Sequence, residues 1–156
     1  MFRTSTTKYI IMQQITAFGT KLPTVDYVSR PGAYALFFNV QSELGLVRTD
    51  GGRYFLAGGG IEAGEDRETA LIREVQEETG LLAQVDQPLG TAVEYYLDRN
   101  EGVYYKKTGH FFRVDILGEA PEGKTEDDHH LIWLPPAEAG PLLYHDMYRW
   151  AMQQAL

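Results

Sequence analysis

Apolar and polar residues alternate over short runs along most of the chain, a period typical of β-strands. Turn-forming residues bound these runs, as expected for strands joined by short connections. The alternation predicts strands over residues 9–16, 33–40, 44–49, 54–56, 93–97, 103–117 and 131–134. A short polar turn at 41–43 joins two of them, and residues 98–102 close a long hairpin. The chain is therefore predicted to be rich in sheet.

Two segments follow a helical period instead. Residues 66–79 contain neither glycine nor proline, and Asp66 and Gly80 suit the N-cap and the C-terminal stop of a helix. Near the end of the chain, the residues at helical spacing are Leu143, Met147, Trp150, Ala151 and Gln154. Strands on both sides of a central helix, with a second helix at the end, predict an α/β fold in which helices enclose a mixed sheet.

The totals limit the class of protein. The chain has 156 residues, without an internal repeat or a linker-like segment, so we expect a single domain over residues 1–156. It contains no cysteine, which excludes a disulfide framework and any thiolate chemistry. We find neither a signal-peptide pattern nor an apolar run long enough for a membrane span, and we expect a cytoplasmic protein. The formal net charge of −8 disfavours nucleic acid polymers and anionic membranes as partners.

The predicted helix over residues 66–79 carries a group of carboxylates. Glu74, Glu77 and Glu78 fall within an arc of roughly 100° when the sequence is placed on a helix. Like charges at these spacings repel each other, and only Arg73 offers compensation nearby. A solvated acidic face is the simplest alternative. A bound cation would relieve the repulsion, and oxygen ligands without cysteine favour Mg²⁺ or Mn²⁺.

Three consecutive glycines precede this helix. Gly58, Gly59 and Gly60 allow the backbone to approach a ligand closely and to offer a carbonyl to a metal or an N–H to a phosphate. A plain tight turn is the alternative interpretation. The glycines are therefore candidates for binding a cofactor or a phosphate.

The segment 59–81, GGIEAGEDRETALIREVQEETGL, resembles the signature box of the Nudix hydrolase family, the family of MutT. The matching positions are Gly59, Glu65, Arg73, Glu74, Val75, Glu77, Glu78, Gly80 and Leu81. The family commonly has a proline where this chain has Ala57, which removes no ligand. The resemblance implies a Nudix-type α/β/α sandwich with a mixed β-sheet between helices.

The resemblance also implies roles for individual residues. Glu74 and Glu78 would be the principal ligands of Mg²⁺ or Mn²⁺, with Glu77 contributing directly or through water. The carbonyl of Gly58 would be a further ligand. Arg73 would orient the carboxylates through ion pairs.

The catalytic base varies among members of the family. It is a box glutamate in some of them and an acidic residue from a later loop in others. Residues 126–128 of this chain are all acidic, and we assign the role to Glu126. An exposed acidic loop without function is the alternative.

The function implied by the resemblance is metal-dependent hydrolysis of the diphosphate linkage in a nucleoside diphosphate joined to another group. The enzyme would be a nucleotide pyrophosphohydrolase in which water attacks phosphorus. The size of the chain resembles members that act on nucleoside triphosphates, while dinucleoside polyphosphates and nucleotide sugars are alternative substrates. A non-catalytic sensor that binds a nucleotide is the alternative function. The partner is a small nucleotide-like diphosphate, and a homodimer is left open.

Other motifs carry less weight. Residues 118–125 satisfy the P-loop pattern by letter, but three acidic residues follow where a helix should begin. His129 and His130 would point to opposite faces of a strand and would not bind one ion together. Candidates for stacking a base or meeting phosphates are Tyr95, Tyr96, Tyr104, Tyr105, Phe111, Arg30, Arg48, Lys106 and Lys107, although most such residues belong to the core or the solvated surface.

Overall fold

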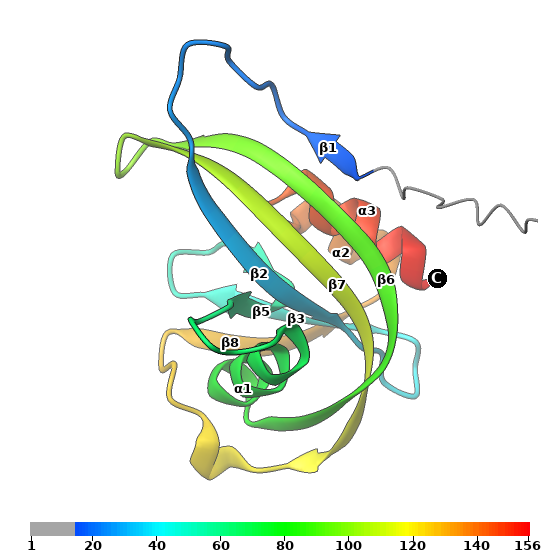
Figure 1. The fold of residues 1–156 in the computed structure, drawn as a ribbon. Coiled ribbons are helices and arrows are strands. Elements are labelled where there is room, and N and C mark those ends of the chain that lie inside the picture. Colours follow the sequence, from blue (N-terminus) through cyan, green and yellow to red (C-terminus); the bar gives the residue numbers. More distant parts are fainter. Residues whose placement is uncertain (1–14) are drawn as a thin grey trace, which may run out of the picture.

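A computed structural model describes residues 15–156, and Figure 1 shows their arrangement. The elements in order are β1 (Thr16–Phe18), β2 (Val28–Leu36), β3 (Leu44–Thr49), β4 (Tyr54–Phe55), β5 (Ala57–Gly60), α1 (Arg67–Thr79), β6 (Leu81–Asp98), β7 (Val103–Glu119), the 3₁₀-helix η1 (Pro121–Gly123), β8 (His129–Leu134), α2 (Pro136–Leu142) and α3 (Asp146–Ala155).

The larger sheet is mixed, with the strand order β1-β6-β7-β2-β5. Its centre is the long antiparallel hairpin of β6 and β7, which spans most of the molecule in Figure 1. Strand β2 runs parallel to β7, and β5 pairs with β2 in the antiparallel sense. A second, smaller sheet has the order β4-β3-β8.

Helices cover the two faces of the larger sheet, and a hydrophobic core lies on each face. Successive side chains of β2 point to opposite faces and therefore contribute to both cores. Ala33 and Ala35 pack with Leu71 and Val75 of α1 on one face. On the other face, Tyr34 packs with the residues of α2 and α3. The predicted α/β sandwich is therefore confirmed, with α1 on one side and α2 and α3 on the other.

Several predicted boundaries are confirmed. Strand β3 occupies the predicted residues, and α1 follows its N-cap Asp66 and ends at Gly80. The predicted C-terminal helix is α3. No helix begins directly after residue 125, where a P-loop would need one, and the next element is strand β8. Most of the strand predicted over 9–16 lies outside the described residues.

Other predictions were wrong. The strand predicted over 33–40 begins earlier, at Val28, and ends at Leu36. Strand β6 begins at Leu81 rather than at 93, because three register shifts between residues 82 and 90 interrupt the alternation that sequence reading relies on. Helix α2 was missed because it contains Pro136, Gly140 and Pro141. Its packing through the buried Ala139 outweighs this poor helix propensity.

In the part of the chain that the structure describes, no helix has the length and apolar character needed to cross a membrane.

Candidate functional site

Helix α1 holds the carboxylates of the site in fixed directions. Its first turn is capped by Asp66, whose side chain accepts a hydrogen bond of 2.7 Å from the N–H of Thr69. It ends at Gly80 in the left-handed conformation, with φ of 73°. Leu71 and Val75 are fully buried, so the helix cannot rotate about its axis without exposing them. The neighbouring face carries Glu74, Glu77 and Glu78 as predicted.

Arg73 connects three carboxylates of this segment. Its guanidinium donates two hydrogen bonds to Glu65, of 2.7 and 2.9 Å, in the paired geometry that suits a carboxylate. Its Nη1 donates to Glu74 at 3.0 Å and to Glu77 at 3.1 Å. The hydrogen bonds from Arg73 lower the pKa of Glu65 to about 2. Arg73 therefore sets the orientation of these side chains before any ligand is present.

Glu78 is the most buried carboxylate of the group. Its side chain is 7% exposed, and Oε1 accepts a 2.7 Å hydrogen bond from the N–H of Gly58. Its Oε2 lies 3.4 Å from Nε2 of His129. Burial raises the pKa of Glu78 to about 8, and the nearby charges of Glu74 and Glu126 act in the same direction.

The glycines before α1 lie in strand β5 and not in a loop, and two of them have no room for a side chain. Gly58 has φ of 141°, and a Cβ there would lie 2.2 Å from the carbonyl oxygen of Ala33. A Cβ on Gly59 would lie 2.6 Å from the carboxyl carbon of Glu74. A Cβ on Gly60 would meet nothing within 4 Å. Gly59 therefore lets β5 lie against the carboxylate of Glu74 on α1, whereas Gly58 lets β5 pack closely against β2.

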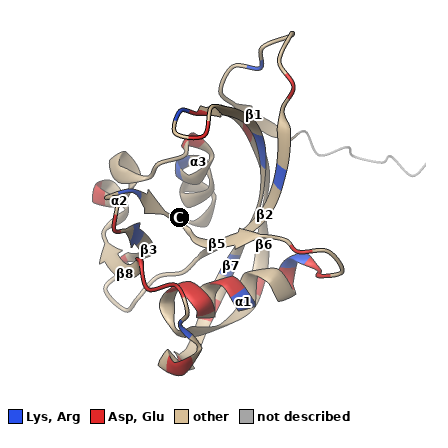
Figure 2. Ribbon diagram, turned by 90° about the vertical axis from the view of Figure 1, so that its left-hand side faces the viewer, with Lys and Arg blue, Asp and Glu red and all other residues tan. Residues whose placement is uncertain are grey.

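The loop before β8 brings further acidic groups to the same end of α1. The N–H groups of Thr125 and Glu126 donate to the carbonyl of Glu77 at 2.9 and 3.0 Å, which ties the loop to the helix. The acidic positions on α1 and on this loop lie beside one another in Figure 2. Hereafter we call Glu74, Glu77, Glu78 and Glu126 the carboxylate cluster.

His129 is a residue of the site that sequence reasoning missed. In residues 15–156, the group of three possible metal ligands whose atoms lie within 4.8 Å of one another is Glu126, Asp128 and His129. The predicted set of Glu74, Glu77 and Glu78 does not converge in this way, because Arg73 holds two of its members. The adjacent His130 contacts Asp50 instead, at 2.6 Å, as expected for neighbours on a strand. The available signal for His129 was its position directly after three acidic residues.

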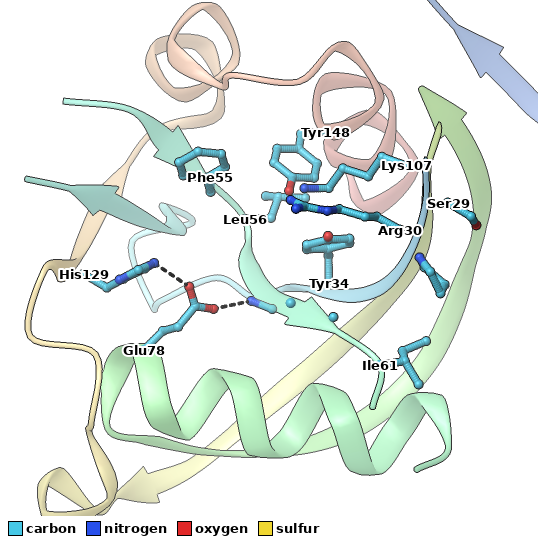
Figure 3. A pocket seen from close by; sticks show the side chains of 14 residues that line it. Ser29, Arg30, Tyr34, Phe55, Leu56, Ile61, Glu78, Lys107, His129 and Tyr148 are labelled. Atoms are coloured by element: carbon cyan, nitrogen blue, oxygen red, sulfur yellow. Dashed lines mark hydrogen bonds and ion pairs between the residues drawn. The ribbon is translucent and has the colours of Figure 1, made fainter. Parts of the chain in front are cut away.

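A pocket of about 500 Å³ opens beside the carboxylate cluster. Figure 3 shows Glu78 and His129 on one side of it, Lys107 and Arg30 on the other, and Tyr34 and Tyr148 between them. The other lining residues are Ser29, Pro31, Phe55, Leu56, Gly58, Gly59, Gly60 and Ile61. Of the residues predicted to contact phosphates, Arg30 and Lys107 line the pocket, while Arg48 and Lys106 do not.

The predicted stacking residues lie elsewhere. Phe111 is 1% exposed in the core, and Tyr105 is 4% exposed. Tyr95 and Tyr104 pack against Tyr27 on the other face of the sheet. The aromatic residues that line the pocket are Tyr34, Phe55 and Tyr148. Each of them is far from the others along the chain, so no local pattern pointed to them.

The donor set fits a hard divalent cation. The carboxylate cluster supplies only oxygen atoms, and Mg²⁺ prefers oxygen ligands. Burial and mutual repulsion raise the pKa values of Glu74 and Glu78, so the ionised cluster is unfavourable unless a cation compensates it. At Gly59, the carboxylate of Glu74 occupies the space that a side chain would need.

Comparison with known proteins identifies the family. A family model described as the NUDIX domain matches residues 28–154. The chain belongs to the Nudix hydrolase family. The resemblance seen in residues 59–81 is thus confirmed, and the matched region extends from the start of β2 into the last turn of α3. No curated protein sequence matches this Nudix chain.

Solved Nudix structures share its fold at low sequence identity. A NUDIX hydrolase from Nitrosomonas europaea superposes with a TM-score of 0.64 at 16% identity, covering 82% of this chain and 88% of that one. A MutT NUDIX hydrolase from Burkholderia pseudomallei gives 0.58 at 23%, covering 83% and 99%. An ADP-ribose pyrophosphatase from Streptococcus suis gives 0.59 at 19%, covering 81% and 90%.

Proposed function

We propose that this Nudix chain hydrolyses the diphosphate linkage of a small nucleotide-like substrate with the help of Mg²⁺ or Mn²⁺. The observation that carries the proposal is the carboxylate cluster at the edge of a pocket whose opposite side is cationic. Such a pocket offers both a cation site and a place for anionic groups. Nucleoside triphosphates are the favoured substrates. Dinucleoside polyphosphates and nucleotide sugars are alternatives.

The roles proposed for the residues follow from their contacts. Glu74, Glu77 and Glu78 would hold the cation, together with the carbonyl of Gly58. When bound, a divalent cation neutralises charge on the phosphate oxygens and activates water. Arg73 keeps Glu74 and Glu77 in place through its hydrogen bonds.

Glu126 would accept the proton of the attacking water. Its backbone N–H is anchored on the carbonyl of Glu77 at 3.0 Å, which keeps its carboxylate at the end of α1. The charge of Glu126 acts on both Glu74 and Glu78, as expected for a base close to the cation ligands. We therefore keep Glu126 as the proposed base.

The test is a panel of nucleoside triphosphates, dinucleoside polyphosphates and nucleotide sugars with Mg²⁺, scored by product identity. The variant is Glu78→Gln, whose amide oxygen can still accept the hydrogen bond from Gly58. We expect turnover to fall at least about a hundredfold with the fold intact, because the charge that holds the cation is lost. Removal of the metal with a chelator should abolish turnover.

Glu68→Gln is the matched control, since Glu68 is an exposed glutamate in the first turn of the same helix. We expect it to keep its activity. Near-normal turnover of Glu78→Gln would contradict the assigned role. Tight binding of a nucleotide without any turnover by the unmodified chain would favour the sensor instead.

A further inference from the structure

The side of the pocket opposite Glu78 carries two cations on neighbouring strands. Arg30 of β2 and Lys107 of β7 are paired in the register of the two strands. Both line the pocket, and Figure 3 shows their charged ends near the hydroxyl of Tyr148. We call Arg30 and Lys107 the cationic pair. The chain has a net charge of −8, but two adjacent cations make the electrostatic potential on this side of the pocket locally positive.

Lys107 has no carboxylate partner among the residues between 15 and 156. Its cross-strand neighbour on the same face is Glu94 of β6. Both oxygens of Glu94 are already engaged, one with Nδ1 of His145 at 2.5 Å and the other with the N–H of Met147 at 3.0 Å. The hydrogen bonds of Glu94 therefore go to His145 and Met147, and no ion pair joins Glu94 to Lys107.

Aromatic rings hold the ammonium group in place. Nζ of Lys107 lies 5.2 Å from the ring centroid of Tyr34 and 5.6 Å from that of Tyr148. These distances are within the range of cation–π attraction, which leaves the hydrogen-bond donors of the ammonium free for another group. Lys107 is thus positioned, charged and available.

Arg30 is fixed by different contacts. Its guanidinium lies 3.8 Å from the ring centroid of Tyr105, and Nη2 donates a 2.8 Å hydrogen bond to the Tyr105 hydroxyl. The carboxylate of Glu101 is 3.9 Å away, and both of these side chains are about half exposed, so this ion pair is weak. Arg30 therefore keeps donors for an anion beside Lys107.

We infer that the cationic pair, and Lys107 above all, binds a phosphate group of the substrate that lies beyond the linkage held at the carboxylate cluster. The pair then selects substrates with three or more consecutive phosphates over nucleotide sugars, in which an uncharged group follows the diphosphate. Lys107 is a specificity residue in this scheme. Its effect on the choice of substrate rests on the proposed function. Its binding of a phosphate chain is independent of turnover.

The first measurement is binding. Isothermal titration calorimetry with inorganic tripolyphosphate, in magnesium buffer at fixed salt, compares the unmodified chain with Lys107→Gln. We expect the variant to bind about tenfold more weakly, because a charged hydrogen-bond donor is lost. Lys106→Gln is the matched control, since Lys106 is adjacent in the same strand but points to the other face of the sheet. We expect it to change affinity less than about twofold.

The second measurement is selectivity. For Lys107→Gln, we expect the ratio of kcat/KM for a nucleoside triphosphate to that for a nucleotide sugar to fall about tenfold, mainly through KM. Lys107→Arg keeps the charge and should retain most of the ratio. Circular dichroism and the melting temperature show whether each variant is folded.

The outcomes separate the two proposals. If tripolyphosphate does not bind to the unmodified chain, or if Lys107→Gln binds as well as Lys106→Gln, the inference is overturned. Equal losses of kcat/KM for both substrates overturn the selectivity. If tripolyphosphate binding depends on Lys107 but no substrate is hydrolysed, the inference on binding stands and the proposed hydrolysis fails.

Discussion

The two sides of the pocket are built in opposite ways. On the side of the carboxylate cluster, Arg73 makes hydrogen bonds to Glu65, Glu74 and Glu77, and most of the contacts join residues less than 25 positions apart. On the other side, the cationic pair comes from β2 and β7, and Lys107 has no acidic partner within residues 15–156. On the carboxylate side, opposite charges are paired with each other, whereas on the cationic side Lys107 has a charge that is not paired within the described residues.

This difference indicates that the carboxylate side depends on the exact positions of its groups, whereas the cationic side depends on an uncompensated charge. Two of the carboxylates on α1 are held by Arg73, and one of them, Glu74, is also crowded by β5, so small displacements should be costly there. The cationic pair needs its charge to stay uncompensated, and the hydrogen bonds of Glu94, its neighbour on β6, go to His145 and Met147 instead. Changes that disturb one of these requirements should leave the other intact.

Gly59→Ala tests the positional requirement, and its effect should exceed those of Glu94→Ala and Glu65→Gln. The added Cβ would lie 2.6 Å from the carboxyl carbon of Glu74, so that side chain or β5 must shift. We expect kcat/KM to fall about a hundredfold, because a displacement on the order of 1 Å in a catalytic group costs that much. Steady-state kinetics with the best substrate of the panel would measure it.

Gly60→Ala is the comparison for this variant. The added methyl group at Gly60 would meet nothing within 4 Å, and we expect a much smaller loss of activity. Equal losses in the two variants would show that the crowding at Glu74 is not what matters. Binding of tripolyphosphate should be reduced far less than activity in Gly59→Ala, since the cationic pair is untouched.

Glu94→Ala tests the buried carboxylate that lies opposite Lys107 in the sheet. The side chain of Glu94 is 8% exposed, and its removal leaves the N–H of Met147 and the imidazole of His145 without their partner. Burial lowers the pKa of His145, so the imidazole cannot easily compensate by taking up a proton. We expect a loss of about 2 kcal/mol in the free energy of unfolding, measured by urea denaturation.

The exposed Glu119 at the end of β7 provides the control, since its replacement by alanine should change stability by less than about 0.5 kcal/mol. A Glu94→Ala variant as stable as Glu119→Ala would mean that the buried pair contributes nothing to the packing of α3 on the sheet.

The sequence predicts the carboxylate side far better than the cationic side. The helical period, Asp66 and Gly80 determine α1 locally, and Glu74, Glu77 and Glu78 then share a face by helix geometry alone. Glu126 was assigned as the base only through the resemblance, and its contact with Glu77 at the end of α1 requires the tertiary fold.

The cationic side depends on strand pairing, which the sequence does not specify. Arg30 and Lys107 become neighbours only because β2 runs parallel to β7 in one register. Arg48 and Lys106 are equally basic in the sequence, and nothing local separates them from the cationic pair. The aromatic lining was missed for the same reason, since Tyr34 and Tyr148 meet across the core.

Glu65→Gln tests the charge of the arginine network and should have the smallest effect. Hydrogen bonds from Arg73 lower the pKa of Glu65 from 4.5 to about 2 in the folded chain. Between these pH values the unfolded chain binds more protons at this site, so stability falls as the pH is lowered through the window. We expect the unmodified chain to lose more stability than Glu65→Gln between pH 5 and about pH 2.5.

Urea midpoints at the two pH values measure the difference, with Glu68→Gln in the same region as control. If Glu65→Gln shows the same acid dependence as Glu68→Gln, the pairing with Arg73 adds nothing to the stability of the folded chain, and its role is confined to orientation.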